Sequence, residues 1–523
     1  MAELESVLDM YGIAVGGPGC QIFPLPDRPK DDRCVQRPYL ILSFPLEDAA
    51  RLSDNSKEIN KWDSTTVERQ KGIGEMLSSC TLIKSVVELW GYGTTIDDCS
   101  SLTRKWIAEP KLGKSIFQKY AAIDQSWKIS IHTLGAKYTK EEHAEMRDQF
   151  SFIGFQGPVK MEDPDQQYIF IQEPEMGKDG NPLYPRHGLK KEIIPENAAR
   201  PPLGCYFGRI LSGFRGRNRA GLDGYSLKKR CYLGPTSMDA ELSFIMTSLG
   251  QVKKGSICFD PFVGTGSILL SCGIRGGFCI GSDIDVRVIR GRSKEETIWK
   301  NFEQFGLARP EIVRTDNSLY HRHFRQHTPI YDAIICDPPY GIRAGAKKTG
   351  SRRNATRPIL EEHRDDHIAQ TKPYPVCDVM ADLLDVAARS LRMGGRLVYV
   401  IPSYQEFDPQ TDLPRHSCLE LVHSCYQPLG PELGRRFVAM KKVADYDESL
   451  RDQYMESVWV NGKESAEKCA NIREKIMENA RKKPGYEEKL AVRREKRKQT
   501  KEAKKQAKRA ARESSHSAPS EQT

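Results

Sequence analysis

The sequence predicts an α/β protein built around a mostly parallel sheet, and two observations lead to this prediction. From Tyr225 onward, short apolar segments alternate with segments of helical length, which is typical of parallel strands joined by crossover helices. The last two apolar segments, LELVHSCYQ and RRFVAMKKV, predict an antiparallel hairpin that ends the sheet. Before Tyr225, strand-like and helical segments are mixed, so a smaller α+β region is predicted there.

The elements follow one another in a clear order. In the upstream region, WKISIHTL and QQYIFIQE predict strands, with the charged helix KEEHAEMRDQF between them. A helix is predicted in SMDAELSFIMTSLG, where apolar residues recur at helical spacing after the capping candidates Thr236 and Ser237. The strands predicted for the parallel sheet are SICFD, FCIGSDID, EIVRTD, DAIICD and GRLVYVIP.

These elements divide the 523 residues into four predicted parts. Residues 1–100 form an N-terminal α+β region, 101–212 a small α+β domain, 213–445 the parallel-sheet domain and 446–523 a basic tail that is helical or disordered. The tail carries fifteen Lys and Arg against four Glu between Arg481 and Arg512, while the whole chain has a net charge of +10. Such a tail binds nucleic acid, serves as a localisation signal or simply solubilises the protein.

The composition indicates where the protein is located and which kinds of site it lacks. No run of about 18 apolar residues predicts a membrane-spanning helix, and Glu3, Glu5 and Asp9 stand where a secretory signal carries positive charge. Fourteen Cys without any CxxC pair predict reduced packing residues rather than disulfides or zinc ligands. We therefore expect a soluble cytoplasmic protein without a metal centre.

Four aspartates stand at the predicted carboxyl ends of four successive strands, namely Asp260, Asp283, Asp316 and Asp337. The carboxyl ends of parallel strands meet at one edge of the sheet, where open α/β sheets bind their ligands. A single aspartate at a strand end is more often the N-cap of the next helix. Four of them in register predict a binding site.

A glycine-rich turn follows the first of these strands in FDPFVGTGSILLSC, residues 259–272. A dinucleotide fingerprint would need a third glycine where Leu269 stands, so NAD is disfavoured. An acid and a phenylalanine before the glycines better suit the sulfonium, amino and carboxylate groups of S-adenosyl-L-methionine. Asp283 can accept both ribose hydroxyls, and Asp316 can reach the adenine amino group. The predicted cofactor site comprises Asp260, Phe262, Gly264, Thr265, Gly266, Asp283 and Asp316.

The motif CDPPYG, residues 336–341, supplies the predicted catalytic residues Asp337, Pro338, Pro339 and Tyr340. Two prolines end the strand and fix the backbone between the acid and the ring. An aromatic amine is a poor nucleophile because its lone pair is delocalised, so its nitrogen must be held in line with the methyl carbon. The Asp337 carboxylate and the Pro338 carbonyl can each accept one N–H while Tyr340 stacks on an extruded base. Guanine is slightly favoured, because its N1–H and N2–H both face one carboxylate.

The motifs DPFVGTG, GSDID, TD and DPPYG, in this order, resemble those of class I S-adenosylmethionine-dependent methyltransferases that modify exocyclic amino groups. More narrowly, YFGR, YSLKKR, TSMDAELSFIM, DPPYGIR and LRMGGRLVYVIP resemble the family of tRNA guanine-10 N2-methyltransferases, over roughly residues 85–445. The resemblance implies a Rossmann-like catalytic domain, a preceding THUMP RNA-binding domain at 101–212, and methylation of the N2 amine of a guanosine in tRNA. It also implies activation by a small zinc-binding protein shared among several methyltransferases.

Two basic segments near the predicted site suggest phosphate contacts, although solvated loops would have the same composition. The predicted RNA-binding residues are Lys228, Lys229, Arg230, Arg343, Arg352 and Arg353. The activator is expected at the strand EIVRTD, which the usual strand order places at a sheet edge. Two alternatives stay open: an amino-methyltransferase acting on rRNA, DNA or a protein glutamine, and a catalytically silent RNA-binding scaffold.

Overall fold

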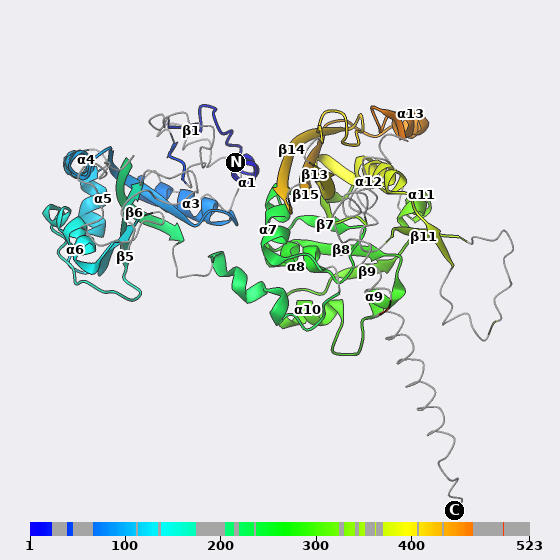
Figure 1. The fold of residues 1–523 in the computed structure, drawn as a ribbon, viewed down its shortest axis with the longest axis horizontal. Coiled ribbons are helices and arrows are strands. Elements are labelled where there is room, and N and C mark those ends of the chain that lie inside the picture. Colours follow the sequence, from blue (N-terminus) through cyan, green and yellow to red (C-terminus); the bar gives the residue numbers. More distant parts are fainter. Residues whose placement is uncertain are drawn as a thin grey trace, which may run out of the picture.

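The computed structural model describes residues 1–23, 39–44, 66–110, 113–133, 138–173, 204–213, 219–234, 237–323, 329–339, 345–350, 361, 370–404, 407–430, 433–463 and 495. Two domains are separate in Figure 1, and we call residues 66–213 the first domain and residues 219–463 the second domain. Helix α1 (Ala2–Asp9) lies between them. The short strands β1 (Gln21–Ile22) and β2 (Leu42–Ser43) pair with each other near α1.

The first domain has a four-stranded sheet in the order β3-β6-β5-β4, in which only β4 and β5 are parallel neighbours. Its strands are β3 (Ser85–Gly93), β4 (Trp127–His132), β5 (Gln166–Glu173) and β6 (Gly204–Gly213). Its helices are α3 (Thr66–Ser78), α4 (Ile96–Ala108), α5 (Gly113–Tyr120) and α6 (Lys140–Asp148). The two strands predicted here and the charged helix between them are confirmed.

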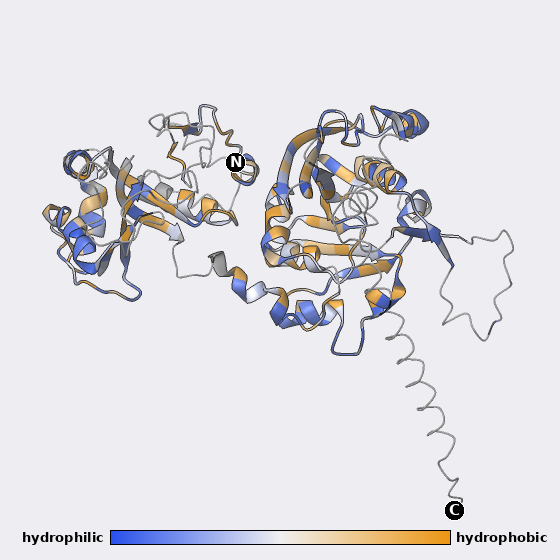
Figure 2. Ribbon diagram, viewed as in Figure 1, coloured by the Kyte–Doolittle hydropathy of each residue, from blue (hydrophilic) through white to orange (hydrophobic). Residues whose placement is uncertain are grey.

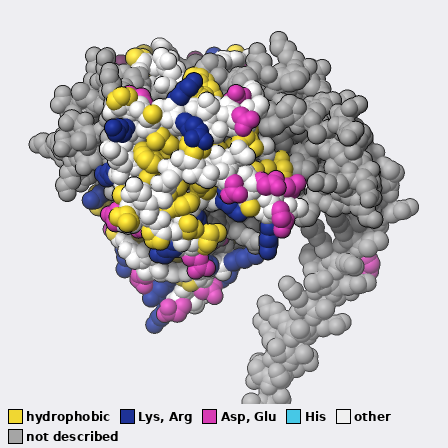
Figure 3. Space-filling model, turned by 90° about the vertical axis from the view of Figure 1, so that its left-hand side faces the viewer, with side chains coloured by type: hydrophobic (Ala, Val, Ile, Leu, Met, Phe, Trp, Pro, Cys, Tyr) yellow, Lys and Arg dark blue, Asp and Glu magenta, His cyan; other side chains and the backbone are white. Residues whose placement is uncertain are grey.

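Aromatic rings fill the core of the first domain. Trp90 of β3 packs edge-on against Tyr168 of β5, and Phe150 stacks on Phe207 of β6. Because β3 pairs with β6, one sheet extends across residue 100, where a domain boundary was predicted, and that residue lies inside α4. Pairing between strands so distant in sequence leaves no mark in the local pattern. Figure 3 looks onto the side of this domain that faces away from the second domain, where hydrophobic side chains lie among charges of both signs.

The second domain has a seven-stranded sheet in the order β14-β15-β13-β10-β7-β8-β9. The strands are β7 (Ile257–Asp260), β8 (Phe278–Asp283), β9 (Glu311–Arg314), β10 (Tyr331–Cys336), β13 (Leu391–Tyr404), β14 (Leu419–Pro428) and β15 (Leu433–Lys442). Five of them run parallel from β13 to β9, while β15 is antiparallel to both of its neighbours. The predicted mostly parallel sheet with a terminal antiparallel hairpin is confirmed, and β9 lies at the edge, as expected.

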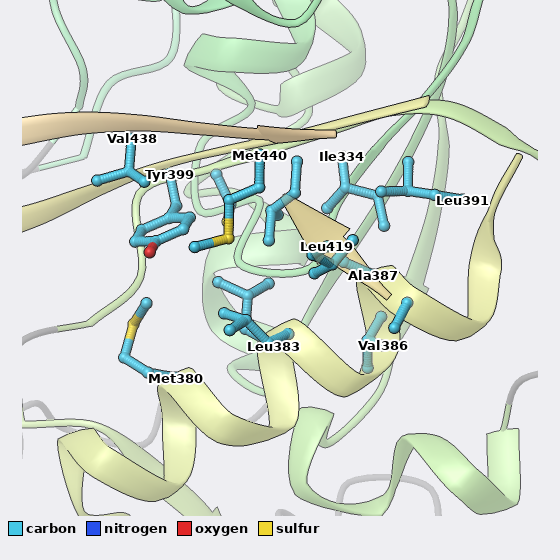
Figure 4. Packing of buried hydrophobic residues seen from close by; sticks show 14 of the residues in the cluster. Ile334, Met380, Leu383, Val386, Ala387, Leu391, Tyr399, Leu419, Val438 and Met440 are labelled. Atoms are coloured by element: carbon cyan, nitrogen blue, oxygen red, sulfur yellow. The ribbon is translucent and has the colours of Figure 1, made fainter. Parts of the chain in front are cut away.

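Helices cover both faces of this sheet, and Figure 2 shows the hydrophobic strands enclosed between them. They are α7 (Ala240–Leu249), α8 (Ser267–Ile274), α9 (Val286–Arg290), α10 (Ile298–Gln304), α11 (Tyr320–His323), α12 (Val376–Ser390) and α13 (Arg451–Glu456). Side chains alternate along β13: Tyr399 faces the cluster that includes Leu383 of α12, whereas Val398 and Val400 face the cluster with Leu269 of α8. Figure 4 shows the packing on the α12 side.

A buried polar network joins the segment after β15 to α12. Asp385 of α12 has no solvent exposure and accepts hydrogen bonds from the hydroxyls of Tyr320 and Tyr446 and from Arg389 Nε. Arg451 of α13 reaches the same network through the Tyr320 hydroxyl at 3.3 Å. The predicted tail therefore begins too early, because residues from 446 to α13 pack on the second domain.

The rest of that predicted tail, including Arg481–Arg512, lies outside the described residues apart from Glu495, as does the proline-rich stretch 174–203. Among the described parts of the chain, no helix is both long and apolar enough to cross a bilayer.

We expect Asp385→Ala to lower the free energy of unfolding of the second domain by about 3 to 5 kcal/mol, because it removes a fully buried carboxylate that accepts from two tyrosine hydroxyls and pairs with Arg389. Burial alone would raise the pKa of Asp385, but the interaction with His416, the hydrogen bonds from the tyrosines and the charge of Arg389 lower it below its ordinary value. The contribution is therefore complete above the unfolded pKa of about 3.9 and is lost as pH falls through the lower folded-state pKa. Urea unfolding at several pH values measures both effects. Asp452→Ala, which removes an exposed acid from α13, is the control and should change stability by less than about 0.5 kcal/mol.

Candidate active site

The four predicted aspartates lie at the carboxyl ends of four neighbouring strands. Asp260 and Asp283 are the last residues of β7 and β8, Asp337 directly follows β10, and Asp316 lies two residues after β9. Ile334 pairs with Phe259, so Asp337 extends two positions beyond the level of Asp260. Asp260 pairs with Gly281 and Asp283 with Arg314, so each successive acid extends beyond its neighbour in the same way. The sheet therefore brings all four acids to one edge.

The glycine-rich turn after β7 is held by Asp283. One oxygen of this carboxylate accepts the Gly264 N–H at 3.0 Å, and the other accepts the Asp285 N–H at 2.9 Å. Gly264 and Gly266 have φ of 51° and 79°, which is the left-handed region that favours glycine. A Cβ on Gly266 would lie 2.9 Å from Ile298 Cγ2, so α10 leaves no room for a side chain there.

Thr265, between these glycines, connects the turn to the segment before α7. Its hydroxyl lies 2.9 Å from the hydroxyl of Ser237, which in turn accepts the Gly234 N–H at 2.9 Å. The residues preceding α7 therefore form a second wall beside the glycine-rich turn.

Asp260 is only 1% exposed and accepts the Phe262 N–H at 2.9 Å. Burial raises the pKa of Asp260 well above its ordinary value, and the negative charges of Asp283 and Asp337 raise it further. Burial also raises the pKa of Asp283. Carboxylates that repel one another in a poorly solvated place favour a positively charged ligand beside them.

Asp316 binds a segment that follows the DPPYG motif in the sequence. One oxygen accepts two hydrogen bonds from Ser318, and the other accepts the Thr349 N–H at 2.5 Å. Burial alone would raise the pKa of Asp316, but the hydrogen bonds from Thr349 and Ser318 lower it. Thr349 belongs to β11 (Lys347–Thr349), which pairs with β12 (Thr371–Pro373). The chain therefore returns from the DPPYG motif to the end of β9.

This two-stranded hairpin forms an apolar wall at the site. Tyr374, just after β12, packs with Ala346 and Val379, and Phe262 of the turn after β7 contacts the same cluster. The Tyr374 hydroxyl donates to Asp382, whose pKa burial raises to about 6. Phe262, a predicted cofactor contact, thus packs against residues that the sequence pattern did not reveal.

Strand β10 ends at Cys336, directly before the predicted catalytic residues. Asp337 is half-buried, Pro338 is buried, and Pro339 is partly buried. Cys336 before them is completely buried between β7 and β13. Tyr340 lies outside the described residues, and so do Arg343, Arg352 and Arg353 of the basic segment.

The described basic residues divide into two groups. Lys228 and Lys229 are exposed in the short helical turn Leu227–Lys229, which Gln304 of α10 anchors through the Lys229 carbonyl. Arg230 is only 7% exposed, and its Nη1 donates to Ser267 Oγ at the start of α8 at 2.8 Å. Burial lowers the pKa of Arg230 to about 10. The structure therefore turns Arg230 inward, away from the surface on which an RNA contact was predicted.

The chemistry available at this edge is binding and orientation. Asp337 and the Pro338 carbonyl can accept hydrogen bonds from an amino group. The glycine-rich turn follows β7, the strand next to β10. Among the described residues, no group of three or more His, Cys, Asp or Glu side chains is arranged to hold a metal ion. Sequence reasoning missed Ser237, Thr349 and Tyr374. Ser237 was noted only as a capping candidate, and no local signal distinguishes the other two.

Two family models match parts of the chain. Residues 61–183 match the family model of the Tmrp11 THUMP N-terminal domain, and residues 228–361 match the RMKL-like methyltransferase domain. The crystal structure of TrmN from Thermus thermophilus has 15% identity and a TM-score of 0.32 over 71% of this chain and 86% of that one.

Named relatives cover most of the chain. The tRNA (guanine(10)-N(2))-methyltransferase TRMT11 of Homo sapiens is 33% identical over 430 residues, 80% of this chain and 82% of the relative. The protein of the same name from Dictyostelium discoideum is 35% identical over 437 residues, 78% of this chain and 81% of the relative. With a THUMP domain before a methyltransferase domain and this identity over four fifths of both proteins, the chain belongs to the family of tRNA (guanine(10)-N(2))-methyltransferases.

Proposed function

We propose that this protein methylates the exocyclic N2 amine of a guanosine in tRNA, at position 10, with S-adenosyl-L-methionine as the methyl donor. The observation that carries the proposal is the position of Asp337 and Pro338 directly after β10, the strand next to β7, which the glycine-rich turn follows. An amine held by these acceptors would lie beside the group bound at the turn. Such a motif suits amino groups of several substrates, and membership of the family favours the N2 amine of guanosine in tRNA among them.

The residues of the turn suit the cofactor. Asp283 would hold the ribose hydroxyls, Asp316 the adenine amino group and Thr265 the amino acid end, while Phe262 would pack beside the adenosine. Each Asp283 oxygen accepts one N–H and has a second lone pair for a ligand, and so has the Asp316 oxygen that accepts the Thr349 N–H. The clustered negative charge around Asp260 favours the sulfonium cation, which supplies the methyl group when the cofactor is bound.

The role of the chain's own residues is to orient the amine. The Asp337 carboxylate and the Pro338 carbonyl would each accept one N–H, which draws the amine from planar toward tetrahedral geometry. Because two prolines fix the backbone there, little conformational freedom is lost when the base arrives. Tyr340 would stack on the extruded base. As the N–C bond forms and the bond between the methyl group and the donor's sulfur breaks, the amine would lose one proton, which the Asp337 carboxylate could accept.

The RNA would approach over the basic residues around this edge. We propose that Lys228 and Lys229, together with Arg343, Arg352 and Arg353, contact phosphates. Arg230 is left out of this set because it is buried. The cytoplasm is the compartment we propose, because all the described cysteines are free thiols, as expected in a reducing environment.

A small zinc-binding activator would bind at β9. Thr315 N–H donates to the Asp283 carbonyl, so the backbone groups of Ile312 and Arg314 point to the open side of the sheet. Val313 is 53% exposed, and the exposed Phe278 of β8 lies on the same face, because Val313 pairs with Ser282. An edge with free backbone groups and exposed apolar side chains suits the addition of a partner's strand.

The first test concerns Asp337. We expect Asp337→Ala to abolish methyl transfer to tRNA while the dissociation constant for S-adenosylmethionine changes by no more than a few fold, because the residue faces the base. Radiolabelled methyl transfer and calorimetry measure the two quantities. A variant that modifies tRNA at nearly the parent rate would contradict the assigned role.

The second test concerns Asp283. We expect Asp283→Ala to weaken cofactor binding by about 1 to 3 kcal/mol, because it removes the ribose contact and releases the Gly264 N–H. Calorimetry gives the difference directly. Asp285→Ala is the matched control: that acid is two residues away and pairs with the exposed Arg287, so the affinity should stay within twofold. Equal affinities for the parent and Asp283→Ala would refute the assignment.

The third test concerns the activator. We expect coexpression with a small zinc-binding activator protein to raise solubility and activity, and we expect Arg314→Pro to prevent copurification, because proline removes an outward N–H. Arg314→Ala keeps that N–H and should still bind. Full activity of the isolated chain, or binding that survives Arg314→Pro, would contradict this proposal.

A further inference from the structure

Helix α1 is buried on two sides by two different domains. Leu4, Val7 and Leu8 pack with Met76 and Leu77 of α3 in the first domain. Ala2 packs against the hydrophobic cluster of the second domain that contains α7 and α8. Figure 1 shows α1 in the space between the domains. Helix α1 therefore packs against elements of both domains.

One buried carboxylate joins the two domains. Glu3 is 5% exposed, and its Oε1 accepts both the Thr81 N–H at 2.6 Å and the Ser248 hydroxyl at 2.9 Å. Its Oε2 accepts the Leu82 N–H at 2.9 Å. Thr81 and Leu82 precede β3 of the first domain, whereas Ser248 belongs to α7 of the second.

Arg275 of the second domain makes the reciprocal contact. Its Nη2 donates to the Ser79 carbonyl of the first domain at 3.1 Å and to the Ser248 hydroxyl at 2.7 Å. Its Nε donates to the Thr247 hydroxyl at 2.6 Å. Burial lowers the pKa of Arg275, and the negative charge of Glu3 opposes that shift most strongly. The acid of α1 and the arginine after α8 thus share Ser248 and stabilise each other.

A second polar contact lies at the other end of α1. Asp9 accepts Arg396 Nη2 at 2.7 Å and Gln251 Nε2 at 2.7 Å, and Gln251 also donates to the Ser6 carbonyl at 3.1 Å. Arg396 is 3% exposed and belongs to β13, where it pairs with Ala333 of β10, the strand that leads to Asp337. The end of α1 is therefore attached to the central strands of the catalytic sheet.

Two connections hold a pair of domains more firmly than one. The chain itself passes from the first domain to the second through residues 214–218. A single short connection leaves two domains free to rotate, which is the usual behaviour of domains without a large interface. Contacts from α1, more than 200 residues earlier in the chain, oppose that rotation.

We propose that α1 is an interdomain clamp, and that Glu3, Asp9, Arg275 and Arg396 are positioning residues for the methylation reaction. The clamp holds the RNA-binding domain and the catalytic domain at one separation, so that a tRNA bound to the first domain presents one nucleotide to Asp337. This inference rests on the tRNA reaction proposed above. It assigns to the beginning of the chain a role in selecting the nucleotide.

The test uses the full chain, with any subunit that its activity requires, and the variant Glu3→Gln/Asp9→Ala. Spin labels on a reactive amino acid incorporated at Asp124 and at Asp452, which are exposed in the first and second domains, report the distance between the domains. We expect one narrow distance distribution in the parent and a broad one in the variant. Asp97→Asn, which removes an exposed acid of α4, is the control and should behave like the parent.

The kinetic part separates positioning from general damage. We expect the variant to lose about tenfold or more in kcat/KM for tRNA and to methylate additional guanosines, mapped by mass spectrometry of nuclease fragments, while its affinity for S-adenosylmethionine stays within twofold. A distance distribution and a methylation map like those of the parent would overturn the clamp. A broad distribution with unchanged kcat/KM and an unchanged map would overturn the positioning role.

Loss of folding in the double variant would not leave the question open. If the double variant no longer binds the cofactor, Asp9→Ala/Arg396→Met decides by the same criteria, because it removes both charges of that pair and so leaves no buried charge unpaired. If the parent methylates no tRNA, the proposed function fails, whereas the distance measurement still tests the clamp.

Discussion

The Asp283 carboxylate ties the turn after β7 to the end of β8 by accepting the N–H groups of Gly264 and Asp285. A turn that contains glycines with positive φ has little side-chain packing of its own to hold it, so its shape depends on acceptors for its N–H groups. The strand order then places β10, with Asp337 behind it, on the other side of β7. The glycine-rich turn and Asp337 stay close together because they follow neighbouring strands of one sheet.

Much of this site could be predicted from the sequence because its signals are local. Asp260, Asp283 and Asp337 each end a short apolar run. The glycines after Asp260 and the prolines after Asp337 are residues typical of turns and strand ends. The contacts of Thr349 with Asp316 and of Tyr374 with Phe262 could not be predicted, because they join segments that only the folded chain brings together. Periodicity shows where a strand ends but not which distant segment will pack over it.

Errors in the prediction have the same origin. Arg230 stands in a basic run and was taken for a surface residue, yet the structure turns its guanidinium toward Ser267 while Lys228 and Lys229 remain outside. The predicted boundary at residue 100 divided a sheet whose strands β3 and β6 are paired across more than 110 residues. Charge and hydropathy indicate whether a residue prefers the surface or the interior. Whether a charged side chain is in fact buried depends on partners that are far away in the sequence.

The place of β15 in the sheet has a consequence for how the protein is made. β14 pairs with β15 and β15 with β13, so the side of β13 away from β10 stays open until the ribosome has synthesised the strand that ends at Lys442. Until then the nascent chain exposes an apolar strand edge, the kind of surface that chaperones cover and that aggregates when left alone. Helix α1 leaves the ribosome before the second domain does, and its contact with Arg396 forms only after nearly four hundred further residues have followed. Translation that stops early would therefore yield a chain whose beginning and whose catalytic sheet both lack their partners.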